Sequence, residues 1–343
     1  MSNEDDRRHV STLIWGYAAS HIIGVSTRWR VFDRIGDTER DGAELAHDLD
    51  LPAGPLTRLL RAAAALGLLA EATPGRFRLT PTGALLRADQ PNSLFDMAKM
   101  LTDPLLTDGW ARLDASVRTG ETAFAGIFGT DFFEHISENP ELNEIFRSGM
   151  TSSTANVAPG LAAACDYGRF GTVVDVGGGS GLMLARILAA NPDTRGVLFD
   201  TPAGLAGAPG VLAEAEVADR CTIVTGDFFR EVPSGADAYL LKTIVHDWDD
   251  EPAAAILATC RKAIPDHGRL LIADRTLPET VDPTRSSLPY MMDLNMMVNY
   301  GGRERTRSDV ERLCATAGFR VVDEHFAQGT DFTIIEAVPV PNG

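Results

Sequence analysis

The feature that most constrains this chain is a glycine-rich turn between an apolar strand and an apolar helix. Residues 172–182 read TVVDVGGGSGL, so that four glycines fall within five positions directly after a β-branched run. Glycine suits such a turn because one position takes a positive φ, and the others let a ligand lie against backbone that carries no Cβ. The turn therefore predicts a nucleotide-like ligand. The alternative is a turn that only packs the helix on the strand.

The acidic residue at the end of this strand, Asp175, indicates which nucleotide the turn would bind. A dinucleotide-binding turn presents free N–H groups at a helix N-terminus to a pyrophosphate, which a carboxylate at this place would repel. The same carboxylate would attract a cationic amino-acid group. The pattern therefore favours the sulfonium ligand S-adenosylmethionine over NAD.

From position 171 onward, apolar strands alternate with helical stretches, as in a doubly wound, Rossmann-like α/β sheet. We expect strands at 172–176, 196–199, 221–225, 238–241, 269–273, 320–324 and 332–338. Ligands of such sheets bind beyond the carboxyl ends of the strands. The residues that follow the strands are therefore the candidates for a binding site.

Two of these strand ends carry further acidic residues. Asp200 ends the second strand, 21 positions after Gly179. A carboxylate at this place typically accepts hydrogen bonds from a ribose diol. The third strand is followed by Asp227, which could reach an adenine amino group, and by Phe228, which could cover the base. A turn role is the alternative for Asp227 taken alone. Together the acidic strand ends predict a nucleoside site.

A histidine follows the fourth strand, at the ligand end of the sheet. His246 is a candidate general base, because an imidazole with a pKa near 6.5 can accept a proton at neutral pH. Asp274 follows the fifth strand and Glu304 lies in the segment GGRERT. Either carboxylate could hold the imidazole N–H and stabilise the imidazolium. A structural histidine is the alternative.

The first 90 residues predict helices followed by a winged helix. Helical patterns at 44–48 and 55–66 precede a short hairpin formed by 68–70 and 76–79. A DNA-binding winged helix needs a basic face, but residues 1–90 hold 11 Arg and no Lys against 12 Asp and Glu, for a net charge of −1. We therefore expect dimerisation, with one face lining a substrate cavity, rather than a nucleic-acid partner.

An apolar pocket for a planar substrate is expected from two helical regions. Residues 91–160 supply Trp110, Phe146 and Met150, which could also be core residues. Between Asp274 and Glu304 the chain is rich in methionine, a residue that suits flat and variable ligands, and asparagines interrupt the apolar run. The candidates there are Met292, Asn295, Met296 and Asn299. A methionine-rich core helix is the alternative.

The composition excludes several classes of protein. The net charge of −17 disfavours nucleic acid, and no apolar stretch reaches the about 18 to 20 residues of a membrane helix. The four cysteines lie far apart, with no CxxC pair and no metal-like spacing to histidine, which indicates reduced thiols and no metal site. With a charged N-terminal segment, MSNEDDRRHV, these features predict a cytoplasmic protein.

As a set, six segments resemble the S-adenosylmethionine-dependent small-molecule O-methyltransferases, a family that includes plant caffeate and flavonoid enzymes and bacterial enzymes that tailor polyketides and phenazines. In chain order the segments are DVGGGSG, LFD, GDFF, LKTIVHDWDD, IADRTLP and GGRERT. The resemblance covers essentially the whole chain. It implies a winged-helix dimerisation domain at 1–90, a helical linker at 91–160 that contributes to the substrate pocket, and a Rossmann-like catalytic domain at 161–343.

The resemblance also implies roles for individual residues. The residues expected to bind S-adenosylmethionine are Asp175, Gly177, Gly179, Asp200, Asp227, Phe228 and Lys242. His246 matches the catalytic base, and Asp274 and Glu304 match the acids that flank it, although the family more often has glutamate at position 274. Methyl transfer to a phenolic hydroxyl of a small aromatic metabolite, with S-adenosylhomocysteine as product and a homodimer as the assembly, is the implied function.

Two other functions remain open from the sequence. Relatives in this family use the same fold and cofactor to decarboxylate, hydroxylate or rearrange their substrates. A winged-helix regulator that senses a small molecule is the second alternative, and the missing basic face argues against it.

Overall fold

The computed structural model describes residues 3–90 and 92–341, which form two compact units. One unit contains the residues up to Thr107 together with Ser148–Ser153, and the other contains Asp108–Arg147 and the chain from Thr154 onward. The segment expected as a linker, 91–160, is therefore divided between the two units. Among the described residues, no helix is both long enough and apolar enough to cross a membrane.

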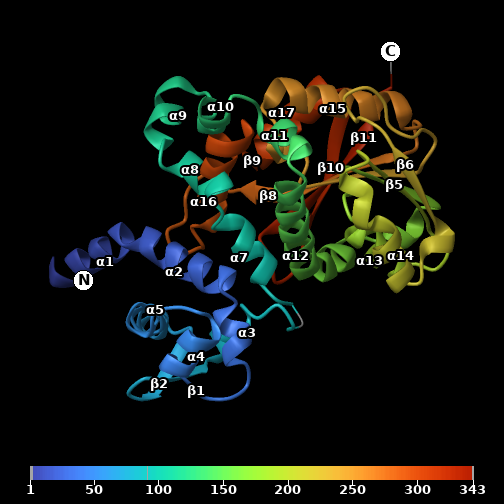
Figure 1. Ribbon diagram of the computed structural model, residues 1–343. Helices are drawn as coiled ribbons and strands as arrows, with labels where there is room; N and C mark the ends of the chain where they lie inside the picture. The colour runs from blue at the N-terminus through green and yellow to red at the C-terminus, as the bar shows by residue number, and fades with distance from the viewer. Residues whose placement is uncertain (1–2, 91, 342–343) are drawn as a thin grey trace. The chain divides into compact units, whose positions relative to one another are not determined.

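The first unit has the elements of a winged helix (Figure 1). Its helices are α1 (Asn3–Ile14), α2 (Gly16–Arg28), α3 (Val31–Ile35), α4 (Gly42–Asp48), α5 (Ala53–Ala65), α6 (Pro81–Ala84) and α7 (Phe95–Leu101). Its strands are β1 (Arg40–Asp41), β2 (Leu69–Thr73) and β3 (Arg76–Leu79), which form an antiparallel sheet in the order β1-β3-β2. Helices α4 and α5 followed by the β2–β3 hairpin match the predicted winged helix.

Helix α4 begins two residues before the predicted start because an aspartate caps it. The Asp41 side chain accepts hydrogen bonds from the N–H groups of Ala43 and Glu44, which satisfies two of the free donors at the helix N-terminus. The apolar faces of these elements bury a common core that includes Phe32 and Phe77.

The second unit contains a large sheet with helices on both faces. Helices α8 (Pro104–Trp110) and α12 (Pro140–Ala164) each contain residues of both units. The other helices of the second unit are α9 (Leu113–Thr119), α10 (Ala123–Phe128), α11 (Phe132–Glu138), α13 (Leu182–Ala190), α14 (Ala208–Glu214), α15 (Asp250–Ala263), α16 (Leu288–Asn295) and α17 (Arg307–Thr316). Short 3-10 turns are η1 (Tyr167–Arg169), η2 (Gly204–Gly207), η3 (Ala218–Arg220) and η4 (Val245–Asp247), and η5 (Met296–Tyr300) is a π-helical turn that continues α16.

The strands of this sheet follow the order β10-β11-β8-β7-β4-β5-β6, with β9 (Arg305–Thr306) paired to β8. Their bounds are β4 (Thr172–Val176), β5 (Arg195–Asp200), β6 (Cys221–Thr225), β7 (Ala238–Lys242), β8 (Arg269–Leu277), β10 (Phe319–Phe326) and β11 (Phe332–Pro339). Strands β4 to β8 are parallel, whereas β10 pairs antiparallel with β11 and β11 pairs antiparallel with β8. The strand order reverses at β4, so the ligand crevice is expected beyond the carboxyl ends of β4 and its neighbours.

Alternate residues of the central strands pack into two separate cores. Leu240 of β7 lies in the core shared with α12, α13 and α14, while its neighbours Tyr239 and Leu241 lie in the core shared with α15 and α17. Figure 1 shows these two groups of helices on opposite sides of the sheet. Burial of both faces explains why the strands are continuous apolar runs rather than alternating ones.

The strand predictions are confirmed in position, with two corrections. The last two strands are antiparallel, not part of a wholly parallel sheet. Strand β8 also runs four residues past its predicted end to Leu277, because β9 pairs with Thr276 and Leu277 and β11 pairs with β8 as far as Arg275. Asp274 therefore lies inside β8 rather than after it.

Candidate active site

The glycine-rich loop after β4 has the backbone that its sequence predicts. Gly177, Gly179 and Gly181 have positive φ values of 71°, 56° and 76°, a region that residues with a Cβ adopt only with strain. At Gly179 a Cβ would meet no atom of the described residues within 4 Å, so this stretch of backbone faces open space. The loop thus offers bare backbone to a ligand, as a nucleoside site requires.

Asp175 lies beneath this loop rather than on its surface. The residue is 1 % exposed, and a Cβ on Gly178 would lie 2.7 Å from its carboxyl group. Burial raises the pKa of Asp175 to about 7, although the positive charge of Lys242 opposes the rise. No hydrogen bond to the carboxylate oxygens comes from the described residues. Contact between Asp175 and the amino group of the cofactor stays a prediction.

Asp200 is held against the loop at the end of β5. Its Oδ2 accepts a hydrogen bond of 2.8 Å from the N–H of Gly179, and its Oδ1 accepts one of 2.6 Å from the N–H of Thr201. Burial raises the pKa of Asp200, while these hydrogen bonds lower it. The carboxylate is thus fixed beside the open loop, in the position expected for a group that binds a ribose.

The predicted adenine site lies after β6. The Oδ1 atom of Asp227 accepts a hydrogen bond of 2.9 Å from the N–H of Phe229, which shapes the turn. The ring of Phe228 packs edge-to-face with Trp248 at a centroid distance of 6.3 Å, and Phe229 packs edge-to-face with Trp248 at 4.8 Å. Trp248, which the sequence reasoning did not select, therefore joins this aromatic group to the turn that carries His246.

Lys242 is the last residue of β7. Its Nζ donates a hydrogen bond of 2.9 Å to Oγ1 of Thr243, a residue with an unusual positive φ of 53°. Burial lowers the pKa of Lys242, and the charges of Asp175 and Asp274 oppose this effect. The ammonium group is thus placed among the acids at the ligand end of the sheet.

His246 lies on the 3-10 turn η4, 5 % exposed, with an acid at each ring nitrogen. Its Nδ1 is 3.0 Å from Oε1 of Glu304, and its Nε2 is 3.4 Å from Oδ1 of Asp247. Burial lowers the pKa of His246, but the negative charges of Glu304, Asp247 and Asp274 outweigh it and raise the pKa to about 9. The ring is therefore oriented by Glu304 and binds its second proton more tightly than a free imidazole does.

Asp247 is a site residue that the sequence reasoning missed. Its side chain is 14 % exposed, and burial raises its pKa to about 7, with the positive charge of His246 opposing the rise. The signal in the sequence was its position directly after His246. Only the tight η4 turn brings the carboxylate of Asp247 to the far side of the same ring.

The two acids expected to flank His246 differ in how closely they engage it. Glu304 is 2 % exposed and bonds directly to the ring. Asp274 makes no hydrogen bond with any described residue through Oδ1, and burial raises its pKa. A cavity of about 10 Å³, close to the room that one water needs, is lined by both acids and His246. Of the two acids, Glu304 is therefore the one that orients the ring.

The predicted substrate residues are brought together in part. Oδ1 of Asn295 accepts hydrogen bonds from Nε1 of Trp110 at 3.1 Å and from Nδ2 of Asn299 at 3.0 Å. Asn295, Met296 and Asn299 are all at most 5 % exposed, whereas Met292 is half-buried. Phe146 packs edge-to-face with Phe132 and Phe133. Met150 belongs to the other unit.

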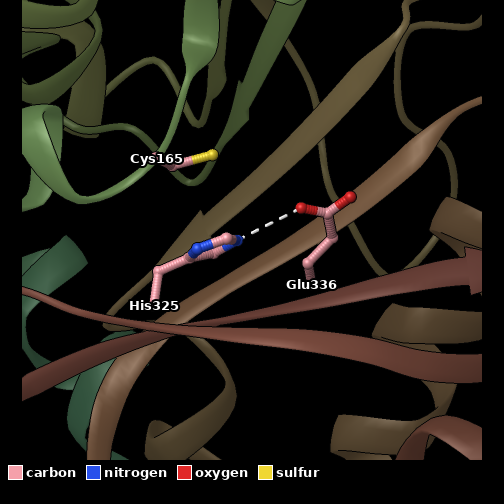
Figure 2. Close-up of side chains that lie close together, drawn as sticks. All are labelled: Cys165, His325 and Glu336. Atoms are coloured by element: carbon pink, nitrogen blue, oxygen red, sulfur yellow. Dashed lines mark hydrogen bonds and ion pairs between the residues drawn. The ribbon is translucent and has the colours of Figure 1, made fainter.

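A separate cluster has the residue types of a metal site. Ligand atoms of Cys165, His325 and Glu336 lie within 4.8 Å of one another (Figure 2). Cys165 directly follows α12, and His325 and Glu336 lie on the antiparallel strands β10 and β11. However, Glu336 also pairs with the guanidinium groups of Arg169 and Arg269, whose positive charge opposes a bound cation. Burial raises the pKa of Cys165 to about 11, so its thiol stays protonated at neutral pH. We therefore describe this group as an ion-pair cluster and assign no metal to it.

The fold and the site together define a nucleoside-binding enzyme with a buried histidine at the ligand end of its sheet. The chain belongs to the O-methyltransferase family, whose domain model matches residues 110–320. It is an S-adenosylmethionine-dependent O-methyltransferase.

Individual relatives match nearly the whole chain. O-demethylpuromycin-O-methyltransferase of Streptomyces alboniger is 45% identical over 97% of this chain and 89% of its own length. Phenazine O-methyltransferase PhzM of Lysobacter antibioticus is 38% identical over 96% of this chain and 95% of its own length. The crystal structure of LaPhzM has a TM-score of 0.92 at 37% identity and covers 97% of this chain and 99% of its own.

A ligand-bound structure is also similar. It is an O-methyltransferase from neocarzinostatin biosynthesis, in complex with S-adenosylmethionine and 2-hydroxy-5-methyl naphthoic acid. It has a TM-score of 0.81 at 31% identity and covers 94% of this chain and 96% of its own. The predicted family, fold class and cofactor are thus confirmed.

Proposed function

We propose that this enzyme methylates a phenolic hydroxyl of a small aromatic secondary metabolite, with His246 as the general base. The observation that carries the proposal is the contact of 3.0 Å between Nδ1 of His246 and Oε1 of Glu304 in a buried site. This contact leaves Nε2, which lies 3.4 Å from Oδ1 of Asp247, as the nitrogen that can take a proton when the ring is neutral. The relatives that act on phenazine and naphthoate compounds support an aromatic acceptor.

The residues of the loop and strand ends fit S-adenosylmethionine. Gly179 offers open backbone, Asp200 is held beside it by the Gly179 N–H, and Phe228 lies next to Asp227. These residues would hold the amino-acid, ribose and adenine parts, respectively. When bound, S-adenosylmethionine supplies an electrophilic methyl group on a sulfonium.

His246 acts on the acceptor hydroxyl. Nε2 of His246 would accept the hydroxyl proton while the acceptor oxygen takes the methyl group that bound S-adenosylmethionine would supply, with S-adenosylhomocysteine as the leaving group. Nδ1–H donates to Glu304, which fixes the tautomer and stabilises the imidazolium that forms. A base with a pKa of about 9 is well matched to a phenol with a pKa near 10, and a positioned base of this kind contributes about 10² to 10⁴ in rate.

Substrate contacts are proposed for the surfaces next to this base. Trp110, Phe146, Met292 and Met296 would supply apolar area, and Asn295 and Asn299 polar contacts. The two asparagines share one hydrogen-bonded group with Trp110, so they would present fixed polar atoms rather than flexible ones.

The test is turnover with S-adenosylmethionine and a panel of phenolic polyketides, phenazines and naphthoates. We expect S-adenosylhomocysteine by mass spectrometry and a methyl ether whose position NMR assigns. His246→Ala should depress methylation 10²-fold or more while calorimetry finds the affinity for S-adenosylmethionine nearly unchanged. Consumption of the acceptor without S-adenosylhomocysteine would instead indicate a non-methylating reaction, and full turnover by His246→Ala would remove that residue from its role.

We also propose a homodimer that buries the exposed apolar side chains of α1 and α2. Leu13, Ile14, Trp15 and Tyr17 lie within five positions of the chain and are 61–65 % exposed, and the rings of Trp15 and Tyr17 stack on each other. Light scattering after gel filtration should give twice the chain mass for the wild type and the monomer mass for Leu13→Glu/Ile14→Glu. A monomeric wild type would contradict the dimer.

The remaining parts of the proposal concern location and other partners. Four free cysteines, three of them buried, support the cytoplasm as the location. The net charge of −1 over residues 1–90 supports the absence of a nucleic-acid partner, which a DNA shift experiment at low salt would test.

A further inference from the structure

Arg305 lies buried behind the turn that carries His246 and bonds to both sides of it. The residue is 4 % exposed. Its Nη1 donates to the carbonyl oxygen of Val245 at 2.9 Å, and its Nη2 donates to the carbonyl oxygen of Trp248 at 2.9 Å. Its Nε and Nη2 also donate to Oδ1 of Asp250, at 3.0 and 2.7 Å. One planar group therefore holds the chain before and after His246.

The neighbours of Arg305 hold His246 itself. The N–H of Arg303 donates to the carbonyl oxygen of His246 at 2.9 Å, and the carboxylate of Glu304 bonds to the ring. Arg305 and Thr306 form β9, which pairs with the end of β8 and thereby anchors the segment to the sheet. The position of the ring relative to Glu304 thus depends on the hydrogen bonds that residues 303–305 make to the η4 turn.

The ion pair with Asp250 does not account for this arrangement by itself. Asp250 is 61 % exposed in its side chain, and exposed ion pairs contribute little. The two carbonyl contacts are what favours arginine, because a guanidinium presents five N–H donors from three nitrogens in a fixed plane, whereas a lysine ammonium presents its three donors from one nitrogen.

We propose that Arg305 is a positioning residue for the base: its guanidinium fixes the η4 backbone so that Nδ1 of His246 stays bonded to Glu304. The proposal rests on the proposed role of His246. Loss of these hydrogen bonds would let the ring move away from Glu304. Three acids face the ring, namely Glu304, Asp247 and Asp274. The base would then be weaker and less well oriented.

The test compares Arg305→Lys with Arg307→Lys, a matched control two positions along the chain. The side chain of Arg307 is 37 % exposed and pairs with the carboxylates of Glu311 and Glu324, which do not hold the η4 turn. For Arg305→Lys we expect kcat to fall at least tenfold, the Kd of S-adenosylmethionine to stay within twofold, and the acid limb of the pH profile of kcat/KM to move to lower pH. Arg307→Lys should match the wild type in all three.

A milder variant keeps the proposal testable should Arg305→Lys not fold. Asp250→Asn weakens one of the three acceptors and leaves both carbonyl contacts, so we expect a two- to fivefold loss of kcat with the same direction of pH shift. An unchanged kcat and pH profile in a folded Arg305→Lys would overturn the proposal. A loss in Asp250→Asn as large as the tenfold expected for Arg305→Lys would also overturn it, because the effect would then lie in the ion pair and not in the carbonyl contacts. His246→Ala, measured in parallel, distinguishes failure of the proposed function from failure of this inference. Full turnover by His246→Ala would refute the role of His246. Loss of activity in His246→Ala but not in Arg305→Lys would refute only the role of Arg305.

Discussion

A Cβ atom on Gly302 would lie 2.1 Å from the carbonyl oxygen of His246. Contacts this close do not occur, so Gly302→Ala must push the η4 turn away from the 302–305 segment. We expect kcat to fall about 10²-fold, because small displacements of positioned groups are costly for catalysis, with little change in the affinity for S-adenosylmethionine. Gly126→Ala, where a Cβ meets no described atom within 4 Å, is the control. Wild-type kinetics in Gly302→Ala would show that the turn tolerates the shift.

The raised pKa of His246 predicts the pH dependence of methylation. The ring must be neutral to accept a proton, and its pKa is about 9, so kcat/KM should rise about tenfold per pH unit and level off above pH 9. Glu304→Gln removes a negative charge next to Nδ1, which should move this limb to lower pH and lower the plateau. Steady-state kinetics from pH 6 to 10.5 measure both effects. A limb that does not respond to Glu304→Gln would assign the titration to another group.

The buried carboxyl of Asp175 predicts a pH-dependent cost in stability. Its pKa in the folded chain, about 7, is higher than the ordinary value of 3.8, so the folded state loses relative stability as the pH rises from about 4 to about 7. Asp175→Asn lacks this titration. Its free energy of unfolding, relative to wild type, should therefore rise by up to about 4 kcal/mol between pH 4 and pH 8. Urea unfolding at the two pH values tests this, and the exposed Asp193→Asn should show no such gain.

The hydrogen bond from Asn299 to Asn295 predicts a change in acceptor binding. Asn299→Leu removes the Nδ2 donor and frees the Asn295 amide, which then bonds only to Trp110. Loss of a buried hydrogen bond costs about 1 to 3 kcal/mol, so the KM of the acceptor should rise about five- to hundredfold or the order of preferred acceptors should change. Met291→Leu, half-exposed on the same helix, is the control. An unaltered acceptor range would place Asn299 outside the pocket.

Most of the sheet could be predicted because its signals are local. Strand β4 and strand β6 have the predicted bounds, since β-branched runs end there at glycine or a polar turn. The extension of β8 to Leu277 could not be predicted, because it depends on pairing with β9, 28 or more residues further along the chain. The antiparallel direction of β10 and β11 depends likewise on non-local pairing.

The residues of the candidate site could likewise be predicted only in part. His246 and Glu304 could be selected because they follow a strand and lie in a recognisable segment, and the structure brings them within 3.0 Å. Asp247 was missed because its contact with Nε2 arises from a tight turn, which a pattern of residue types does not reveal. The group formed by Trp110 and Asn295 joins positions 185 apart in the chain, so only tertiary structure discloses it.

The ring of His246, the proposed proton acceptor, is carried by a turn after β7, whereas the methionines and asparagines of α16 and η5 belong to a different segment. The main-chain N–H of Glu304 connects the two through Asp293 of α16. New side chains could therefore be introduced along α16 to admit other acceptors while the proton-transfer geometry is inherited unchanged, provided that Asp293 is kept.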